Sequence, residues 1–115
     1  MNINRDYKLT YNILTDELIG DTLEFVNTDR DTANIYVTIT PIIEGITVQM
    51  RIRTNTDEKV ILDGVLVGQM IYEFNLPTEL IQIVGTHKME LQVIHGEDTR
   101  TSDCVPIKVN RSITT

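Results

Sequence analysis

Residues 70–95 read MIYEFNLPTELIQIVGTHKMELQVIH, and this stretch decides the fold. Alternate positions at its start and again at its end share one face: Met70, Tyr72, Phe74, Leu76, and then His87, Met89, Leu91 and Val93. A period of two is typical of a β-strand with one buried face. Between the two runs, Pro77 suits the first turn of a helix, where its missing N–H needs no partner, and Gly85 can end such a helix. The stretch therefore predicts a strand, a short helix near residues 77–84 and a second strand.

Two upstream segments show the clearest alternation in the chain and predict strands that pack on this stretch. Their inward residues are Ala33, Ile35, Val37 and Ile39 in the first segment, and Val48, Met50 and Ile52 in the second. Pro41 ends the first segment, because proline cannot donate a ladder hydrogen bond. Residues 55–58 are polar and predict a turn after the second.

The chain before residue 33 is less regular. Residues 7–14 predict a strand that places Tyr7, Leu9 and Tyr11 on one face. The acidic segment 15–32 follows, and within it Leu23 and Phe25 suggest one short strand. The flanks of that short strand are expected to be loops.

Asp63-Gly64 is a pair that supports a tight type I′ hairpin turn. Residues 60–62 would lead into this turn. Residues 65–67 would then form a short return strand or an irregular approach to Gly68.

The final strand is expected to carry Val105, Ile107 and Val109 inward. To face Met89 and Leu91 across a hairpin, these residues need a loop of about three residues near Glu97–Thr99. A two-residue loop at Gly96-Glu97 would turn Cys104 inward instead. Both alternatives remain open.

Composition agrees with a β fold. Thr, Ile and Val supply 42 of the 115 residues, and Ala33 is the single alanine. β-branched side chains pack well on a pleated surface, and alanine is the best helix former. Residues 1–115 are expected to form a single domain with one core. The expected fold is an all-β antiparallel β-sandwich of Ig-like architecture, with seven or eight strands and without the paired cysteines and tryptophan of immunoglobulin domains.

The charge balance argues against some partners. The formal net charge is −7, and no basic track is visible that could displace counterions from a nucleic acid or bind an anionic membrane. The acidic surface is expected either to be simply solvated or to face a basic partner. The N-terminus lacks the apolar segment of a secretory signal, and no apolar run approaches the ~20 residues that span a bilayer. With one cysteine and no intrachain disulfide, the chain is expected to be soluble and made in the cytoplasm.

The sequence shows no catalytic arrangement. Cys104 with His87 or His95 is the best pair for thiol chemistry, yet Cys104 is more simply a small buried residue if it faces Met89. The two histidines lie about 26 Å apart on one extended strand, so they cannot share a metal ion and are expected at the rim. Ser102 and Ser112 lie in no nucleophile motif.

Other polar and aromatic residues give equally weak signals. Asp29-Arg30-Asp31 lacks the oxygen spacing of a calcium loop. Glu73 and Glu90 face outward on alternating strands, and are expected to be surface residues rather than an acid–base pair. Exposed aromatic rings can form a platform for a sugar. Tyr36 is expected to face outward, and the orientation of Tyr7 and Tyr11 is open. A carbohydrate-binding or adhesion module is therefore the alternative function. No catalytic, cofactor-binding or metal-binding residues are assigned.

The spacing of these elements resembles a known family. The pattern comprises Gly20-Asp21-Thr22 before a strand, the hairpin within 52–62, Leu76-Pro77, Glu79-Leu80, Gly85-Thr86 before the strand MELQV, and a closing strand that ends in Lys108-Val109. From about Ile19 to Val109 it resembles the N-terminal domain of phage baseplate upper proteins, found in tailed phages of Gram-positive bacteria.

The resemblance implies a non-enzymatic connector. In that family a β-sandwich domain helps fix the host-recognition device to the rest of the tail baseplate, commonly within an oligomer. The implied partners are other phage baseplate and tail proteins or a second copy of the chain, with no nucleic acid and no membrane insertion, and the implied location is the virion. Leu80 and Val84 would be core residues, and no catalytic residues or cofactors are transferred. Family members continue into a stalk and further domains, so this chain is expected to be an excised domain or a short relative.

Overall fold

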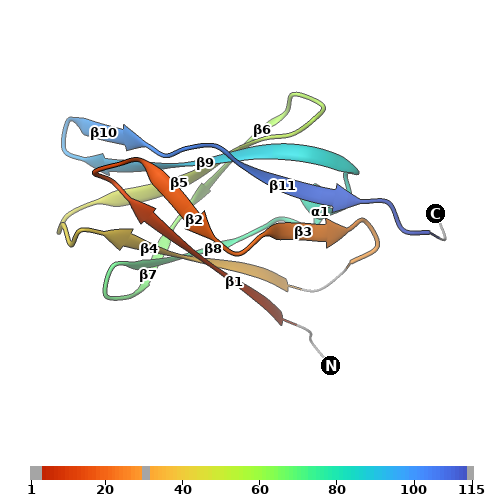
Figure 1. Cartoon of the computed structure of the whole chain (residues 1–115), viewed down its shortest axis with the longest axis horizontal. Coiled ribbons are helices and arrows are strands. Elements are labelled where there is room, and N and C mark those ends of the chain that lie inside the picture. The colour runs from red at the N-terminus through yellow and green to blue at the C-terminus, as the bar shows by residue number, and fades with distance from the viewer. Residues whose placement is uncertain (1–3, 30–31, 114–115) are drawn as a thin grey trace.

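The computed structural model describes residues 4–29 and 32–113. In these residues eleven strands form two stacked β-sheets, and one short helix lies between two of the strands in the chain (Figure 1). The five-stranded sheet has the order β2-β1-β4-β8-β7. Its strands are β1 (Asn4–Asn12), β2 (Glu17–Gly20), β4 (Thr32–Thr40), β7 (Val65–Gly68) and β8 (Ile71–Asn75). The six-stranded sheet has the order β3-β11-β9-β5-β6, with β10 beside β9. Its strands are β3 (Leu23–Val26), β5 (Thr47–Arg53), β6 (Lys59–Asp63), β9 (Gly85–His95), β10 (Asp98–Thr101) and β11 (Val105–Asn110).

The expected β-sandwich is confirmed, with two differences in detail. The strands outnumber the seven or eight expected, because short edge pieces such as β2, β7 and β10 are separate strands. The sheets are also mixed rather than purely antiparallel, since β1 pairs parallel with β4 and β11 pairs parallel with β3.

The core lies between the sheets, on the faces that the alternation predicted. The inward residues of β4, β5, β8 and β9 are all buried: Ala33, Ile35, Val37, Ile39, Val48, Met50, Ile52, Tyr72, Phe74, His87, Met89, Leu91 and Val93. Met70 and Leu76, at the two ends of β8, are buried as well. From β1, Leu9 and Tyr11 enter the same core, whereas Tyr7 is half-buried.

Strand β2 corrects the expectation of loops on both sides of Leu23 and Phe25. Glu17–Gly20 pairs antiparallel with β1, from Leu9 opposite Gly20 to Asn12 opposite Glu17. Only Leu18 of these four residues is buried. A four-residue strand with one buried side chain shows too little alternation to be recognised in the sequence.

The prediction of a hairpin turn at Asp63-Gly64 is wrong. After β6 the chain crosses from the six-stranded to the five-stranded sheet, so β7 pairs with β8 and not with β6. Gly64 does not adopt the positive φ that a type I′ turn requires. Its N–H donates to the Val48 carbonyl at 2.9 Å, and a Cβ at this position would lie 2.7 Å from the Phe74 ring. Glycine is needed here because the crossing passes over the core.

The helix is shorter than expected. Helix α1 spans Thr78–Ile81, with Pro77 as its N-cap residue and Gln82 as its C-cap residue. Gly85 therefore does not end the helix; it begins β9 at a φ of +133°. A Cβ on Gly85 would clash with the Asn55 side-chain amide.

The side chains of this segment close one end of the core. Leu80 and Ile81 are buried, and Val84 is half-buried.

Each of the two loop alternatives after β9 holds in part. His95 pairs with Asp98, so the loop is the two-residue Gly96-Glu97, not the three-residue loop. Yet Val105 pairs with Met89 and Ile107 with His87, which restores the register expected for the last strand. One additional residue between β10 and β11 changes the register, because Ser102 is still bonded opposite Leu91.

We predict that Gly64→Ala lowers the free energy of unfolding by roughly 1–3 kcal/mol, because the new methyl group overlaps the Phe74 ring. Gly68→Ala is the matched control, since its Cβ would meet the Ile71 side chain at an ordinary 3.4 Å. Urea unfolding of both variants measures the difference. Equal stability of the two variants would contradict the tight crossing at Gly64.

Candidate functional site

The thiol and imidazole groups do not meet. Cys104 is exposed, which corrects the interpretation of a small buried residue: Val105, not Cys104, lies opposite Met89. His87 is wholly buried, so the expectation of a rim histidine is wrong for it, whereas His95 is exposed. His87 points from β9 into the core, whereas Cys104 lies on the outer surface of the same sheet.

His87 has a structural environment. Its Nδ1 accepts the Asn55 backbone N–H at 3.1 Å. Its Nε2 therefore carries the proton and donates to the Ile83 carbonyl at 3.0 Å. Both ring nitrogens are used, and the ring ties the β5–β6 turn to the segment after α1.

The acidic candidates do not assemble into a site. Glu73 lies on the outer face of the five-stranded sheet and Glu90 on that of the six-stranded sheet, so the sandwich separates them. Asp29 accepts the Val26 N–H at 2.9 Å and lies 3.6 Å from Arg5, while residues 30–31 fall outside the described residues. Among residues 4–29 and 32–113, no group of three His, Cys, Asp or Glu side chains could hold a metal ion.

The two serines have local partners. The buried Ser102 accepts the Leu91 N–H at 2.8 Å through Oγ and donates to the Asp103 carbonyl at 2.9 Å. The Ser112 N–H donates to Asn27 Oδ1 at 2.8 Å. The Ser102 hydroxyl therefore replaces a backbone partner where the register of β10 and β11 changes.

The tyrosines build no aromatic shelf in the part of the chain that is described. Tyr11 and Tyr72 are buried, and Tyr7 points inward, where its ring packs edge-on against Phe25 with centroids 5.4 Å apart. Tyr36 alone lies on an outer face, opposite Glu73. Burial, followed by the charges of Glu73 and Asp6, raises the pKa of its phenol.

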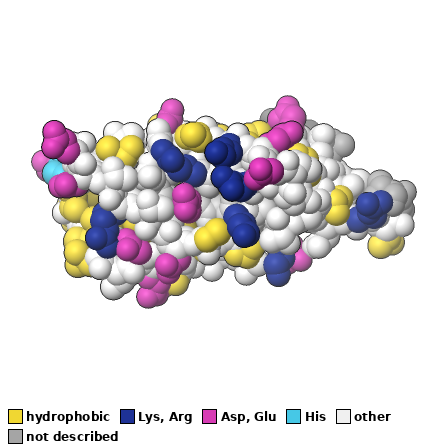
Figure 2. Space-filling view, turned by 90° about the horizontal axis from the view of Figure 1, so that it is seen from above, with side chains coloured by type: hydrophobic (Ala, Val, Ile, Leu, Met, Phe, Trp, Pro, Cys, Tyr) yellow, Lys and Arg dark blue, Asp and Glu magenta, His cyan; other side chains and the backbone are white. Residues whose placement is uncertain are grey.

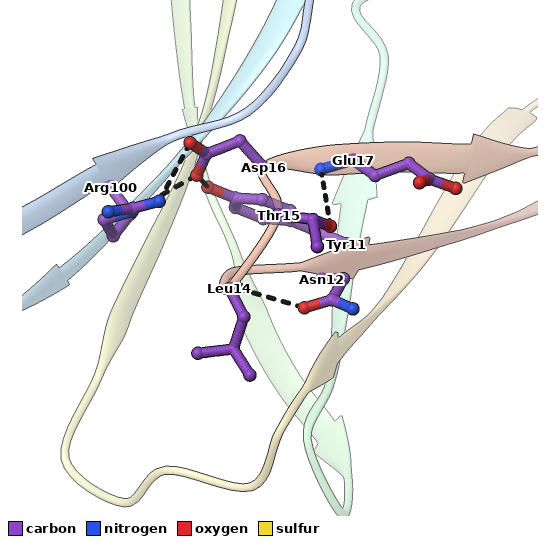
Figure 3. Close-up of polar contacts among 7 residues, drawn as sticks. All are labelled: Tyr11, Asn12, Leu14, Thr15, Asp16, Glu17 and Arg100. Carbon is purple, nitrogen blue, oxygen red and sulfur yellow. Dashed lines mark hydrogen bonds and ion pairs between the residues drawn. The ribbon is translucent and has the colours of Figure 1, made fainter.

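A polar network joins the two sheets at one end of the sandwich (Figure 3). Asp16, in the β1–β2 turn, accepts hydrogen bonds from Arg100 Nε at 3.2 Å and Nη2 at 2.9 Å, and from the Tyr11 hydroxyl at 3.2 Å. Asp16 adopts a φ of +61°, which aspartate tolerates better than most residues. Burial, together with the charge and hydrogen bond of Asp16, raises the pKa of Tyr11 to about 12. The network fastens β10 to the β1–β2 turn.

The feature that sequence reasoning missed is a basic face on the outside of the six-stranded sheet. It comprises five of the chain's ten basic residues: Arg51, Arg53, Lys59, Lys88 and Lys108. Arg53 lies opposite Lys59 on one side and opposite Lys88 on the other. Figure 2 shows Lys and Arg side chains gathered midway along the molecule, with acidic side chains beside them and at one end.

The basic face contains a shallow depression of about 430 Å³ between β5, β6 and β9. Its lining includes Arg51, Arg53, Lys59 and Lys88 against the single carboxylate of Glu90, together with the exposed apolar side chain of Ile61. The depression therefore carries a net charge of +3 in a chain whose formal net charge is −7. The composition alone hides this separation of charge, because the four cations of the depression come from three strands, β5, β6 and β9. The outward positions of Arg51 and Arg53 were the available signal in the sequence.

Comparison with known proteins shows the fold. The structure is similar to the N-terminal domain of phage TP901-1 ORF48, with a TM-score of 0.65 and 9% sequence identity over 94% of this chain and 99% of that chain. No protein-family model matches the sequence, and no curated protein matches it. In the described residues, no helix is long and apolar enough to cross a membrane.

We predict that His87→Leu, which replaces the ring with an apolar side chain of similar size, lowers the free energy of unfolding by roughly 2–4 kcal/mol. The reason is that the Asn55 N–H and the Ile83 carbonyl lose their hydrogen-bond partner. His95→Leu, on the same strand but exposed, changes stability by less than about 0.5 kcal/mol. Thermal and urea unfolding measure both. Similar losses in the two variants would show that His87 is not a core residue.

We predict that the stability of the protein depends on Tyr11 at high pH. The folded-state pKa is about 12, above the usual value of 10, so the stability from the neutral phenol is complete below pH 10 and is lost as the pH rises towards 12. The free energy of unfolding falls by about 1.4 kcal/mol per pH unit in that window, relative to Tyr11→Phe. Urea unfolding of both proteins from pH 9 to 12 measures the difference. Parallel curves would contradict this environment for Tyr11.

Proposed function

We propose that this chain is a non-enzymatic structural domain of a phage virion, acting as an adaptor that connects the host-recognition device to the tail baseplate. The observation that carries the proposal is the fold shared with the N-terminal domain of phage TP901-1 ORF48 along almost the whole length of both chains. The pattern of the Leu76–Gly85 segment and the strand that follows, which resembles the N-terminal domain of phage baseplate upper proteins, agrees with this proposal. Its partners would be other baseplate and tail proteins.

The organisation of the side chains fits a connector. The two sheets bury a continuous apolar core, and the buried His87 holds backbone groups of two other segments in place. The nucleophilic and acidic side chains discussed above lie on separate surfaces or serve as backbone partners, as Ser102 does. A connector needs rigidity and contact surfaces, and a β-sandwich supplies both.

Contact surfaces are present where the sheets end. Every side chain of β7, the outer strand of the five-stranded sheet, is exposed, including those of Val65, Leu66 and Val67. Ile61 of β6 is exposed at the outer strand of the other sheet. Exposed apolar side chains on an open strand edge are typical of surfaces that other proteins cover. By contrast, a carbohydrate-binding module would need several outward-facing aromatic rings, and only Tyr36 among the described tyrosines has that position.

The proposal predicts that the protein is a component of purified particles of the phage that encodes it. Mass spectrometry of gradient-purified virions should detect the chain, and gold-labelled antibodies should bind at the tail tip rather than at the head. Deleting its gene should give particles that lack a complete tail tip and adsorb poorly to the host. Virions that contain no trace of the chain, or deletion particles with intact tail tips, would contradict the proposal.

A further inference from the structure

We propose that the basic face of the six-stranded sheet docks a short carboxylate-rich segment of a partner protein. The contact would centre on the depression between β5, β6 and β9, where Arg51, Arg53, Lys59 and Lys88 surround a single Glu90. This inference rests on the charges of the basic face and does not depend on the proposed role in a phage particle.

The register of three strands forces like charges together. Lys59, Arg53 and Lys88 form one row across β6, β5 and β9, each directly opposite the next. Directly opposed positions of neighbouring strands lie about 5 Å apart, and like charges at that separation destabilise a sheet. A row of three cations therefore costs stability in the free protein, and an anion bound across it relieves the repulsion.

The chain neutralises this row only in part. Asp57 lies 3.6 Å from Arg53 Nε, and both side chains are largely exposed, so the pair is weak. Glu90 lies opposite Arg51 in the next row. Arg51 Nη2 donates to Gln49 Oε1 at 3.4 Å, but its Nε is buried and has no hydrogen-bond partner among the described residues. That buried N–H is out of a ligand's reach, but the guanidinium has five N–H donors, and its outer nitrogens are suited to a carboxylate oxygen.

The size of the row limits the length of the ligand. Three strands span about 10 Å, a length that about three residues of extended chain cover. Two or three carboxylates would match the row, and Ile61, which is 57% exposed beside the depression, offers contact to one apolar side chain.

A nucleic acid fits this face less well. A nucleic acid presents a long, regular line of negative charge, and it would extend from the depression over a molecule whose remaining surface is acidic. Asp63 and Glu24 already flank the basic face on β6 and β3. A short acidic segment of a protein meets the four cations without reaching these carboxylates.

The test uses a synthetic hexaglutamate peptide and the full chain at an ionic strength of about 0.15 M, where charges more than about 8 Å apart are largely screened. Isothermal titration calorimetry measures affinity, and NMR shift changes of backbone amides map the contact. Lys88→Glu and Lys59→Glu should each weaken binding about tenfold. Lys8→Glu is the matched control: it makes the same change in net charge on the outer face of the five-stranded sheet and should alter affinity less than about twofold. Circular dichroism establishes that each variant is folded.

The supporting result is binding that shifts amides of β5, β6 and β9, fades at high salt and is lost selectively in the Lys88 and Lys59 variants. The proposal is overturned by no binding of the peptide, by equal losses in the Lys8 and Lys88 variants, or by shifts outside the basic face. Tighter binding of a single-stranded DNA oligonucleotide to this face would also overturn it. Self-association abolished by Lys88→Glu would assign the face to a second copy and exclude a separate partner.

Discussion

The structure depends on the strict alternation of side chains along β9. His87, Met89, Leu91 and Val93 are buried, while the residues between them face outward. Strands β5 and β11 pair with β9 residue by residue, so its register decides which side chains of three strands enter the core. A slip of one residue would exchange the two faces of a strand. The same register that fills the core brings Arg53 and Lys88 together on the outside.

Local patterns were enough to predict the sandwich and most of its core, because β4, β5, β8 and β9 alternate clearly over five residues or more. They failed where the outcome depends on distant contacts. Asp63-Gly64 has the composition of a hairpin turn, yet Gly64 packs against Phe74 at a crossing between sheets. Gly85 has the composition of a helix end, yet it makes room for Asn55 at the start of β9.

The candidate sites show the same division. Strand alternation predicts that Glu73 and Glu90 are separate surface carboxylates, and the two sheets do hold them apart. It could not show that His87 is buried between two backbone groups, because both partners belong to other segments. Nor could it show the basic face, since cations from β5, β6, β9 and β11 become neighbours only through strand pairing.

The central claim is that β9 organises a rigid two-sheet body, and amide hydrogen exchange followed by NMR tests it most directly. For amides in core strands, the free energy of the opening that permits exchange approaches the free energy of global unfolding, whereas amides in edge strands exchange through local opening. The account predicts the slowest exchange in β9 and in its partner β5, with faster exchange in β2, β7 and β10. Exchange in β9 as fast as in the edge strand β7 would contradict it.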